Sequence, residues 1–380
     1  MRTARRVWLT LHLYLGLGLG ALFALLGLTG SVLVFYLDVD AALNPRIRVA
    51  APVPAAPAPE AVLRRLQALH PERHGPWRIE MPLAADAPLM ARYSNPVETA
   101  GRGFAPLMLT LDPATLEATS QRFWGDYAVS WLYDLHYTLL LRQPGTTAVG
   151  IAGLAMLVSL LTGLWLWWPS RARLAAALRP VLRSGALRKT YGLHVLGGIY
   201  GLLVLAALAF TGSALALSEQ TRWLVGGLSP LRAPLRPGAG LLADGAAAIS
   251  LDEAARVARG RFPDAELRWV EAPGAAGGPI VLRLWQPGEP GRRFPRTQVW
   301  VHPASGEILA VRDPRDNSGG DTFMAWLHPL HNGEALGLAG RWLACIAGLL
   351  PAMLLVTGWL RWRHKRRARR ATAERRGGGR

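Results

Sequence analysis

Cysteine is almost absent from this 380-residue sequence, and its one cysteine, Cys345, lies within an apolar stretch. A single cysteine excludes internal disulfide bonds and cysteine-ligated metal clusters. It also excludes covalent attachment of haem through a Cys-x-x-Cys-His motif. Any metal or redox chemistry in this chain must therefore use other side chains.

Charged residues are nearly absent from four long apolar stretches. Each stretch is about 20 residues long or longer, the length needed to cross a hydrocarbon core roughly 30 Å thick. The stretches are residues 7–37, 147–168, 191–217 and 342–362. They predict four membrane-spanning helices.

Acidic residues are also scarce, since 25 Asp and Glu stand against 43 Lys and Arg, for a formal net charge of +18. The excess is confined to the N-terminus, the link between the second and third apolar stretches, and the C-terminal tail. Basic segments beside spans mark the cytoplasmic side of a membrane, so we expect both termini and the link to be cytoplasmic. A polybasic tail beside a span is ordinary membrane topology, so the lipid bilayer is the expected partner and a nucleic acid is not.

The chain contains an internal repeat. The first and third apolar stretches both open with Leu-His and close with Thr-Gly-Ser. The interval from His12 to Thr29 is identical to the interval from His194 to Thr211. The register therefore holds without a gap between the first and second halves of the chain.

The second and fourth stretches repeat in the same way, beginning before the membrane. The interval from His136 to Thr162 is identical to the interval from His331 to Thr357. Each half thus consists of a span, an outer segment, a histidine segment and a second span. This order predicts a pseudo-twofold arrangement about an axis along the membrane normal.

The two outer segments correspond as well. Each offers one amphipathic helix, at residues 60–69 and 251–261, followed by short strands and a hairpin at residues 111–117 and 301–307. They predict two small α+β domains outside an all-α four-helix transmembrane bundle. The expected organisation is a first span in residues 1–37, a first outer domain in 38–130, an outer histidine segment with the second span in 131–168, a cytoplasmic loop in 169–190, a third span in 191–217, a second outer domain in 218–325, an outer histidine segment with the fourth span in 326–362, and a basic cytoplasmic tail in 363–380.

Four histidines occupy repeat-equivalent positions, and the predicted topology groups them into two pairs. His12 and His194 lie toward the cytoplasmic face, and His136 and His331 lie toward the outer face. A polar residue in a span is costly and is a candidate functional residue by default. Interhelical hydrogen bonding alone is the simpler interpretation, but the pairing by a repeat favours a shared ligand.

Haem suits these pairs better than zinc. A zinc site needs further Cys, His or carboxylate ligands, and none lies near His12 or His194 in the sequence. Two imidazoles suffice for a b-type haem in apolar surroundings with small residues nearby. Glycines follow both inner histidines, at positions 16, 18 and 20 and at positions 197, 198 and 201. The same glycines also suit plain helix packing.

The outer pair leaves one choice open. His328 lies three residues before His331, and its repeat equivalent is Tyr133. Pro329 makes a regular helix unexpected there. His331 is the expected ligand, and His328 is the alternative. A break at Gln143-Pro144-Gly145 is expected to separate the segment of His136 from the second span.

These motifs as a set resemble the PepSY-associated transmembrane family, which includes bacterial ferric-siderophore reductases and iron-regulated membrane proteins. The resemblance covers nearly the whole chain. It includes Leu-His-x-x-x-Gly and Thr-Gly-Ser in the first and third spans, the Asp-Pro-Ala-Thr and His-Pro-Ala-Ser-Gly-Glu hairpins, and Leu-His-Pro-Leu-His-Asn-Gly before the fourth span. It implies that the outer segments are periplasmic PepSY-like domains. It also implies an inner-membrane oxidoreductase with two haem b groups that passes electrons to a periplasmic ferric siderophore.

On this interpretation the haem iron is bound through His12 and His194 on the inner side and through His136 and His331 on the outer side. Catalytic residues are not identified. Some relatives carry a fused cytoplasmic flavin reductase domain. This sequence has an arginine-rich tail in that place, so we expect a separate cytoplasmic electron donor, and a flavin reductase is one candidate. The alternative is a haem-free PepSY-type sensor or an accessory protein for transport or proteolysis.

Overall fold

The computed structural model describes residues 2–49, 51–179, 185–233, 235, 238, 240–242, 247–274 and 277–377. Part of the basic link and the last three residues of the tail lie outside these residues. The chain divides into two compact units. The helical unit comprises Met1–Phe35, Leu132–Thr221 and Leu327–Arg380, and the sheet unit comprises Tyr36–Trp131 and Arg222–Trp326.

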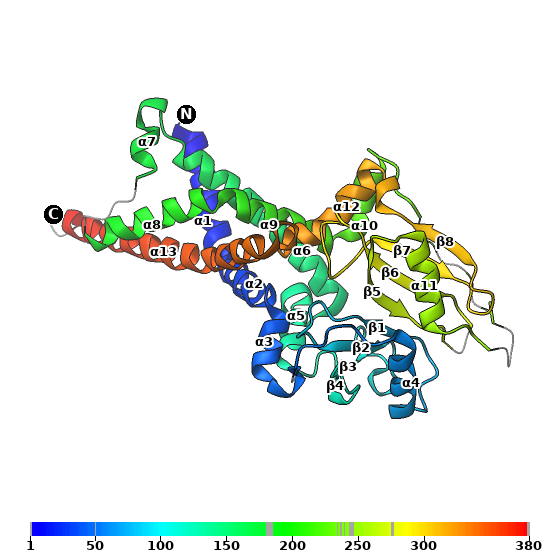
Figure 1. Ribbon diagram of the computed structural model, residues 1–380. Coiled ribbons are helices and arrows are strands. Elements are labelled where there is room, and N and C mark those ends of the chain that lie inside the picture. The colour runs from blue at the N-terminus through cyan, green and yellow to red at the C-terminus, as the bar shows by residue number, and fades with distance from the viewer. Residues whose placement is uncertain are drawn as a thin grey trace. The chain divides into compact units, whose positions relative to one another are not determined.

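The sheet unit is built on one antiparallel sheet of eight strands (Figure 1). The strands follow one another across the sheet in the order β4-β3-β2-β1-β5-β6-β7-β8. They are β1 (Trp77–Glu80), β2 (Leu89–Tyr93), β3 (Leu107–Leu111), β4 (Ala118–Phe123), β5 (Glu266–Glu271), β6 (Ile280–Trp285), β7 (Thr297–Val301) and β8 (Ile308–Arg312). The helices and 3-10 turns of this part of the chain are α3 (Tyr36–Leu43), η1 (Pro45–Ile47), α4 (Pro59–Leu69), η2 (Val97–Thr99), α11 (Leu251–Arg261) and η4 (Pro314–Asp316).

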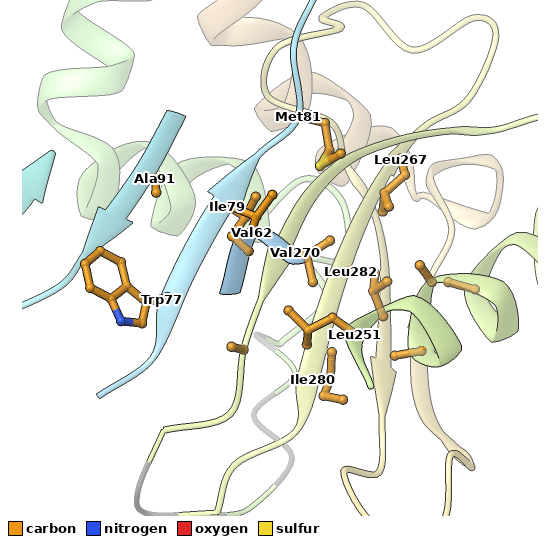
Figure 2. Close-up of a cluster of buried hydrophobic side chains, with 14 of the residues drawn as sticks. Val62, Trp77, Ile79, Met81, Ala91, Leu251, Leu267, Val270, Ile280 and Leu282 are labelled. Atoms are coloured by element: carbon orange, nitrogen blue, oxygen red, sulfur yellow. The ribbon is translucent and has the colours of Figure 1, made fainter. Parts of the chain in front are cut away.

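Helices α4 and α11 cover one face of this sheet. Successive side chains of each strand point to opposite faces of the sheet. On the face covered by the helices, Ile79, Leu109 and Leu282 are fully buried. Val62 of α4 and Leu251 of α11 belong to the same apolar cluster (Figure 2). The hydrophobic core therefore lies between the helices and a single sheet face.

The two helices also cap each other at their N-termini. A carboxylate oxygen of Glu60 accepts a hydrogen bond from the backbone N–H of Leu251 at 2.9 Å. A carboxylate oxygen of Asp252 accepts one from the backbone N–H of Glu60 at 3.2 Å. Carboxylates at these positions satisfy unpaired N–H groups and favour the positive end of the helix dipole. The exchange ties the first outer segment to the second.

The predicted outer helices and hairpins are confirmed, but their separation into two domains is not observed. Strand β1 of the first outer segment pairs with β5 of the second, with Ile79 opposite Val270. Both strands would otherwise be open edges, which tend to pair with another strand. The two four-stranded halves therefore form one sheet with one continuous core.

The hairpins show how closely the halves correspond. The first places Leu116 at φ 59°, and the second places Gly306 at the equivalent position at φ 74°. The backbone N–H of Asp112 donates to Glu117 O at 3.0 Å, and that of His302 donates to Glu307 O at 2.8 Å. Glycine adopts this left-handed conformation without a steric cost, whereas leucine does not.

The helical unit contains most of the apolar sequence. Some of its long helices are continuous, and others are pairs of helices joined at a bend (Figure 1). The remaining helices and 3-10 turns, of which α5, α10 and α12 each belong in part to the sheet unit, are α1 (Arg2–Gly18), α2 (Gly20–Leu33), α5 (Ala128–Thr138), α6 (Arg142–Trp167), η3 (Arg171–Arg173), α7 (Leu174–Ala177), α8 (Ala186–Tyr200), α9 (Leu202–Ala216), α10 (Ser218–Gly226), α12 (Gly319–His331), η5 (Glu334–Leu336) and α13 (Gly337–Gly377).

The predicted fold class, an all-α four-helix transmembrane bundle with two separate α+β domains, is wrong. Within the described residues, two continuous helices are long and apolar enough to cross a membrane, Arg142–Trp167 and Glu334–Glu374. The other two predicted spans are broken by bends of 56° between α1 and α2 and 59° between α8 and α9. The number of spans is therefore two, or up to four if each bent pair is one span. About half of the chain belongs instead to the sheet unit.

The bends have a sequence cause and a packing result. Leu19, flanked by two glycines, lies seven residues after His12, and Gly201 lies seven residues after His194. Glycine is a common site of helix kinks. On one side of the bends, α1 packs against α6 and α8 packs against α13. On the other side, α2 packs against α13 and α9 packs against α6, so each bent helix changes partner at its break.

Small residues allow the close contacts of α2 with α13 and of α9 with α6. A side chain at Gly348 of α13 would clash with Ser31 of α2, and one at Gly153 of α6 would clash with Ser213 of α9. The hydroxyl of Ser31 donates to the carbonyl oxygen of Cys345 at 2.7 Å. Close packing of small residues is a usual means of helix association in membranes.

Two local predictions are also corrected. The break before the second predicted span falls at Leu139–Leu141, where Leu139 and Leu140 have positive φ, and not at Gln143-Pro144-Gly145. Pro144 is accommodated in the first turn of α6, where its missing N–H costs little. Pro329 lies inside α12, which continues through it to His331.

Candidate functional site

The ring of His12 is held by two oxygens of α6. Its Nδ1 lies 3.0 Å from the carbonyl oxygen of Ser159 and 3.0 Å from the hydroxyl of Thr162. The hydroxyl of Thr162 donates its own proton to the Ser159 carbonyl at 2.8 Å. Both oxygens therefore act as acceptors, and Nδ1 must carry the proton that they share.

A glycine completes this arrangement. Gly163 follows Thr162, and a Cβ atom at Gly163 would lie 3.0 Å from Cε1 of His12. Any side chain at this position would press on the imidazole. A carbonyl, a threonine hydroxyl and a glycine, at positions i−3, i and i+1 of one helix, thus form a seat for the histidine of another helix. We call this arrangement the Thr-Gly seat.

The same seat occurs four times in the helical unit. His194 lies against Leu354, Thr357 and Gly358 of α13, and its Nδ1 is 3.1 Å from the Leu354 carbonyl and 3.0 Å from the Thr357 hydroxyl. The outer histidines repeat the pattern, with His136 on Leu26, Thr29 and Gly30 of α2 and His331 on Leu208, Thr211 and Gly212 of α9.

At the other three seats the threonine hydroxyl also donates its proton within its own helix. Thr29, Thr211 and Thr357 each donate to the carbonyl four residues earlier in their own helix, at 2.7 Å in every case. Each hydroxyl therefore accepts a hydrogen bond from histidine Nδ1–H. This fixes the tautomer, because a neutral ring protonated on Nδ1 presents an unprotonated Nε2. The unprotonated nitrogen is the one that can bind a metal.

The seated histidines form the two pairs that the repeat predicts. The ring centroids of His12 and His194 are 6.3 Å apart, and their planes are inclined at 85°. The ring centroids of His136 and His331 are 6.2 Å apart, and their planes are inclined at 41°. Each pair takes one histidine from each half of the chain. The four predicted site residues therefore come together as expected.

The spacing of the pairs suits a metal ion between two imidazoles. At a metal–nitrogen distance of about 2.0 Å, two rings bound to opposite sides of one ion have centroids roughly 6 Å apart. A hydrogen bond from the remaining ring nitrogen to a carbonyl or another oxygen is the usual support of a metal-binding histidine. Each pair could therefore hold one metal ion, such as the iron of a cofactor, between its two imidazoles.

Other metal sites are not evident in the described residues. No group of three or more His, Cys, Asp or Glu side chains there could hold a metal ion. A bis-histidine centre has only two protein ligands and lies outside that class of site. His328 is in the same helix as His331, but the ring that lies beside His136 at the outer pair is that of His331.

Five of the six glycines that follow the inner histidines divide into two groups. Side chains at Gly20, Gly197 and Gly201 would clash with side chains of α13, so these glycines permit helix packing. At Gly16 and Gly18, an added Cβ would meet no atom within 4 Å. Only the second group leaves space on the α1 surface, four and six residues beyond His12.

The residues that hold the histidines were not predicted from the sequence. The Thr-Gly pairs served there only to mark the repeat. Their spacing from the histidines, which is identical in the two halves of the chain, was the available signal. The spacing is equal because the two spans of each half hold each other's histidines. Thr29 in the first span holds His136, which precedes the second span, and Thr162 in the second span holds His12.

Apolar helices long enough to cross a bilayer, with two half-buried pairs of hydrogen-bonded histidines, define a membrane protein with a candidate metal or cofactor site. The chain belongs to the family described as PepSY-associated TM region, whose model matches residues 9–365. This match confirms the predicted family. The comparison with individual curated proteins gave no match.

Proposed function

We propose that this protein is a ferric-siderophore reductase of the bacterial inner membrane that holds two haem b groups. The proposal is carried by one observation, the convergence of four equivalent Thr-Gly seats into two pairs of imidazoles. Bound between two imidazoles, haem exchanges single electrons while the protein tunes its potential through ligands, hydrogen bonds and burial.

The chain's own residues would perform three tasks at each pair. The Thr-Gly seat holds the imidazole in one orientation and leaves Nε2 unprotonated. Its oxygens accept the Nδ1 proton, which increases the electron density that Nε2 can donate. The apolar helices around the pair exclude water, which lowers the local dielectric constant and strengthens these interactions.

The positions of the pairs along the helices support transfer across a membrane. His12 of the inner pair and Thr29 of an outer seat belong to the same bent helix pair, formed by α1 and α2. At 1.5 Å per residue the helical path between them is at most about 25 Å, close to the thickness of the hydrocarbon core. One pair would therefore lie near each face of the bilayer.

The distribution of positive charge indicates how the chain is oriented in the membrane. The N-terminus, the link after α6 and the tail of α13 are rich in arginine and lysine, so we place them and the His12–His194 pair on the cytoplasmic side. The sheet unit and the His136–His331 pair would then be periplasmic. Reporter fusions at Gly185 and at the C-terminus should be active only in the cytoplasm, and fusions at Asn95 and Arg292 only in the periplasm. Periplasmic activity at Gly185 would overturn this orientation.

The electron donor and acceptor follow from the same orientation. A separate cytoplasmic protein, for which we propose a flavin reductase, would supply electrons to the inner pair. A ferric siderophore would receive them near the outer pair, and reduction to ferrous iron would weaken its binding by the chelator. The substrate would not need to enter the membrane.

The absorption spectrum of the purified protein tests this proposal. We expect a Soret band and sharp bands of a six-coordinate low-spin haem after reduction, with two haems per chain. Acid-acetone extraction should remove all of the haem, because the chain has no Cys-x-x-Cys-His motif. Dithionite-reduced protein should be oxidised by a ferric siderophore in anaerobic stopped-flow experiments. A colourless protein from haem-sufficient cells would contradict the proposal and leave a haem-free accessory role.

A further inference from the structure

The sheet face opposite α4 and α11 carries more positive than negative charge. Cross-strand register and strand alternation place five arginines and three glutamates of the strands on it. We call it the arginine face, and it consists of Arg78, Arg92, Arg122, Arg283 and Arg312 with Glu80, Glu266 and Glu271.

Two of these arginines are direct cross-strand neighbours. Arg78 of β1 lies opposite Arg92 of β2, and on its other side it lies opposite Glu271 of β5. Like charges directly opposite each other destabilise a sheet. Glu271 forms an ion pair with Arg78 at 2.5 Å and a longer one with Arg283 at 3.7 Å, so one carboxylate serves two guanidinium groups.

A buried tryptophan fixes the positions of these groups. Trp269 of β5 is only 4% exposed, and Phe294 packs against it edge-on. The guanidinium carbons of Arg78 and Arg283 lie 4.6 Å and 4.9 Å from its ring centroid. Cation–π contacts of this kind hold a guanidinium without neutralising its charge. The centre of the face is therefore ordered and remains positive.

The donors at this centre are not all satisfied by the protein. In the described part of the chain, the buried Nε atoms of Arg78, Arg92 and Arg283 have no hydrogen-bond partner. Burial and the neighbouring Arg78 lower the pKa of Arg283 to about 10, and burial followed by Arg78 also lowers that of Arg92. Side chains of Arg78 and Arg283 are still 18% and 26% exposed, so a ligand can reach them.

We infer that the centre of the arginine face, formed by Arg78, Arg92 and Arg283, binds a multiply charged anion. Resting on the proposed function, we assign this ligand as a ferric chelate whose carboxylate or catecholate oxygens give it a net negative charge. The planar fork of a guanidinium matches paired oxygens of this kind and pairs with them more strongly than a neutral donor does. The site lies where β1 meets β5, so it exists only because both halves of the chain contribute to one sheet.

Gallium(III) complexes test binding separately from electron transfer, because gallium(III) resembles ferric iron in charge and size but is not reduced under these conditions. The full-length protein, in nanodiscs of zwitterionic lipid, is titrated calorimetrically with gallium citrate, which is anionic, and with gallium desferrioxamine B, which is cationic. We expect the anionic complex to bind more tightly, and its affinity to fall as salt is added.

Substitution locates the site. Arg92→Gln and Arg283→Gln should each weaken gallium citrate binding about tenfold or more, since each removes hydrogen bonds to a charged ligand. Arg256→Gln removes the same charge from the exposed surface of α11, on the opposite face of the sheet, and should leave binding unchanged. Thermal unfolding of each variant confirms that the sheet is intact.

Three results would overturn the inference: equal affinity for the two complexes, unchanged binding in Arg92→Gln and Arg283→Gln, or an equal loss in Arg256→Gln. The anion site and the proposed function can fail separately. A protein without haem that still binds gallium citrate through Arg92 would retain the anion site and lose the reductase assignment. A protein with two haems and no binding would do the reverse.

Discussion

The hydroxyl oxygen of Thr29 lies 2.9 Å from Nδ1 of His136, and the hydroxyl proton points to the Leu25 carbonyl at 2.7 Å. The oxygen therefore acts as an acceptor for the histidine. Thr29→Val keeps the shape of the side chain and removes this acceptor. Because supporting hydrogen bonds of metal-binding histidines are typically worth 10- to 100-fold in affinity, we expect haem at the outer pair to bind about 10- to 100-fold more weakly.

Haem titration followed by absorbance measures this change. The matched control is Thr146→Val in α6, whose hydroxyl likewise bonds to its own helix, at Arg142, in an exposed hydrogen bond. The control should retain the affinity of the unmodified protein. Equal haem affinity in the Thr29 and Thr146 variants would contradict a supporting role for the seat.

Removing a ligand should affect one pair and leave the other. His12→Ala and His194→Ala should each lower haem content from two to about one per chain, with loss of the inner haem, and His136→Ala and His331→Ala should do the same for the outer haem. The ring centroids in each pair lie about 6 Å apart, and both histidines would be needed for six-coordination. Pyridine haemochrome assays measure the content. Loss of both haems from every variant would indicate a folding defect instead.

His328→Ala is the control for the outer pair. His328 shares α12 with His331, so its removal perturbs the same helix. We expect haem content to stay near two per chain, because the Thr211 seat and the ring contact with His136 belong to His331. Loss of the outer haem from His328→Ala but not from His331→Ala would reverse the ligand assignment.

The glycine of a seat should tolerate no side chain. At Gly212 an added Cβ would lie 2.8 Å from Cε1 of His331, which is well inside contact distance. Gly212→Ala should therefore displace the imidazole and reduce outer haem content. Gly16→Ala is the matched control, because an added Cβ there meets no atom within 4 Å. Replacement of a helical glycine there should leave haem content unchanged and favour the helix by up to about 1 kcal/mol.

A carboxylate of the sheet unit should make its stability depend on acidity. Hydrogen bonds from the Arg315 side chain, supported by those from the Arg315 backbone and from Gln286, lower the pKa of Asp313 below its usual value of 3.8. A lowered pKa in the folded state stabilises the protein above the unfolded pKa near 4, and this contribution is lost as pH falls through the lower folded value.

Asp313→Asn should therefore destabilise the sheet unit near pH 7 by about 1 to 3 kcal/mol, the usual cost of losing hydrogen bonds to a charged group. The difference from the unmodified protein should shrink as pH approaches 3. Thermal unfolding followed by circular dichroism at both pH values measures it. A difference of the same size at both pH values would show that the charge of Asp313 is not its cause.

Much of the local structure could be predicted from the sequence, because helix and strand signals extend over only a few neighbouring residues. The helix at residues 251–261 has its predicted bounds, and short strands follow it as expected, since apolar periods of 3.6 and 2 residues distinguish the two. The pairing of the four site histidines also followed from the repeat alone. A gapless repeat places equivalent residues about a common axis before any coordinate is known.

The remaining features depend on contacts distant in the sequence. The pairing of β1 with β5 joins edge strands about 190 residues apart, and no period or turn signal in either strand specifies its partner. The bend at Leu19 is a second example, because a long apolar run gives the same hydropathy whether it is straight or broken. The role of Thr29 could be seen only when His136 was placed beside it.

The antiparallel pairing of β1 with β5 also bears on how such a chain could arise. Ile79 and Val270 face each other at the centre of an eight-stranded sheet, and the order of strands is the same on reading outward from either one. Two copies of a half-length polypeptide could close the same sheet by pairing their first strands. The same two copies would supply both rings of each histidine pair, because every pair takes one ring from each half. A symmetric homodimer of half-length subunits would thus already contain every element of the site. Fusion of the two subunits would then free each half to diverge, as His328 and Tyr133 have done.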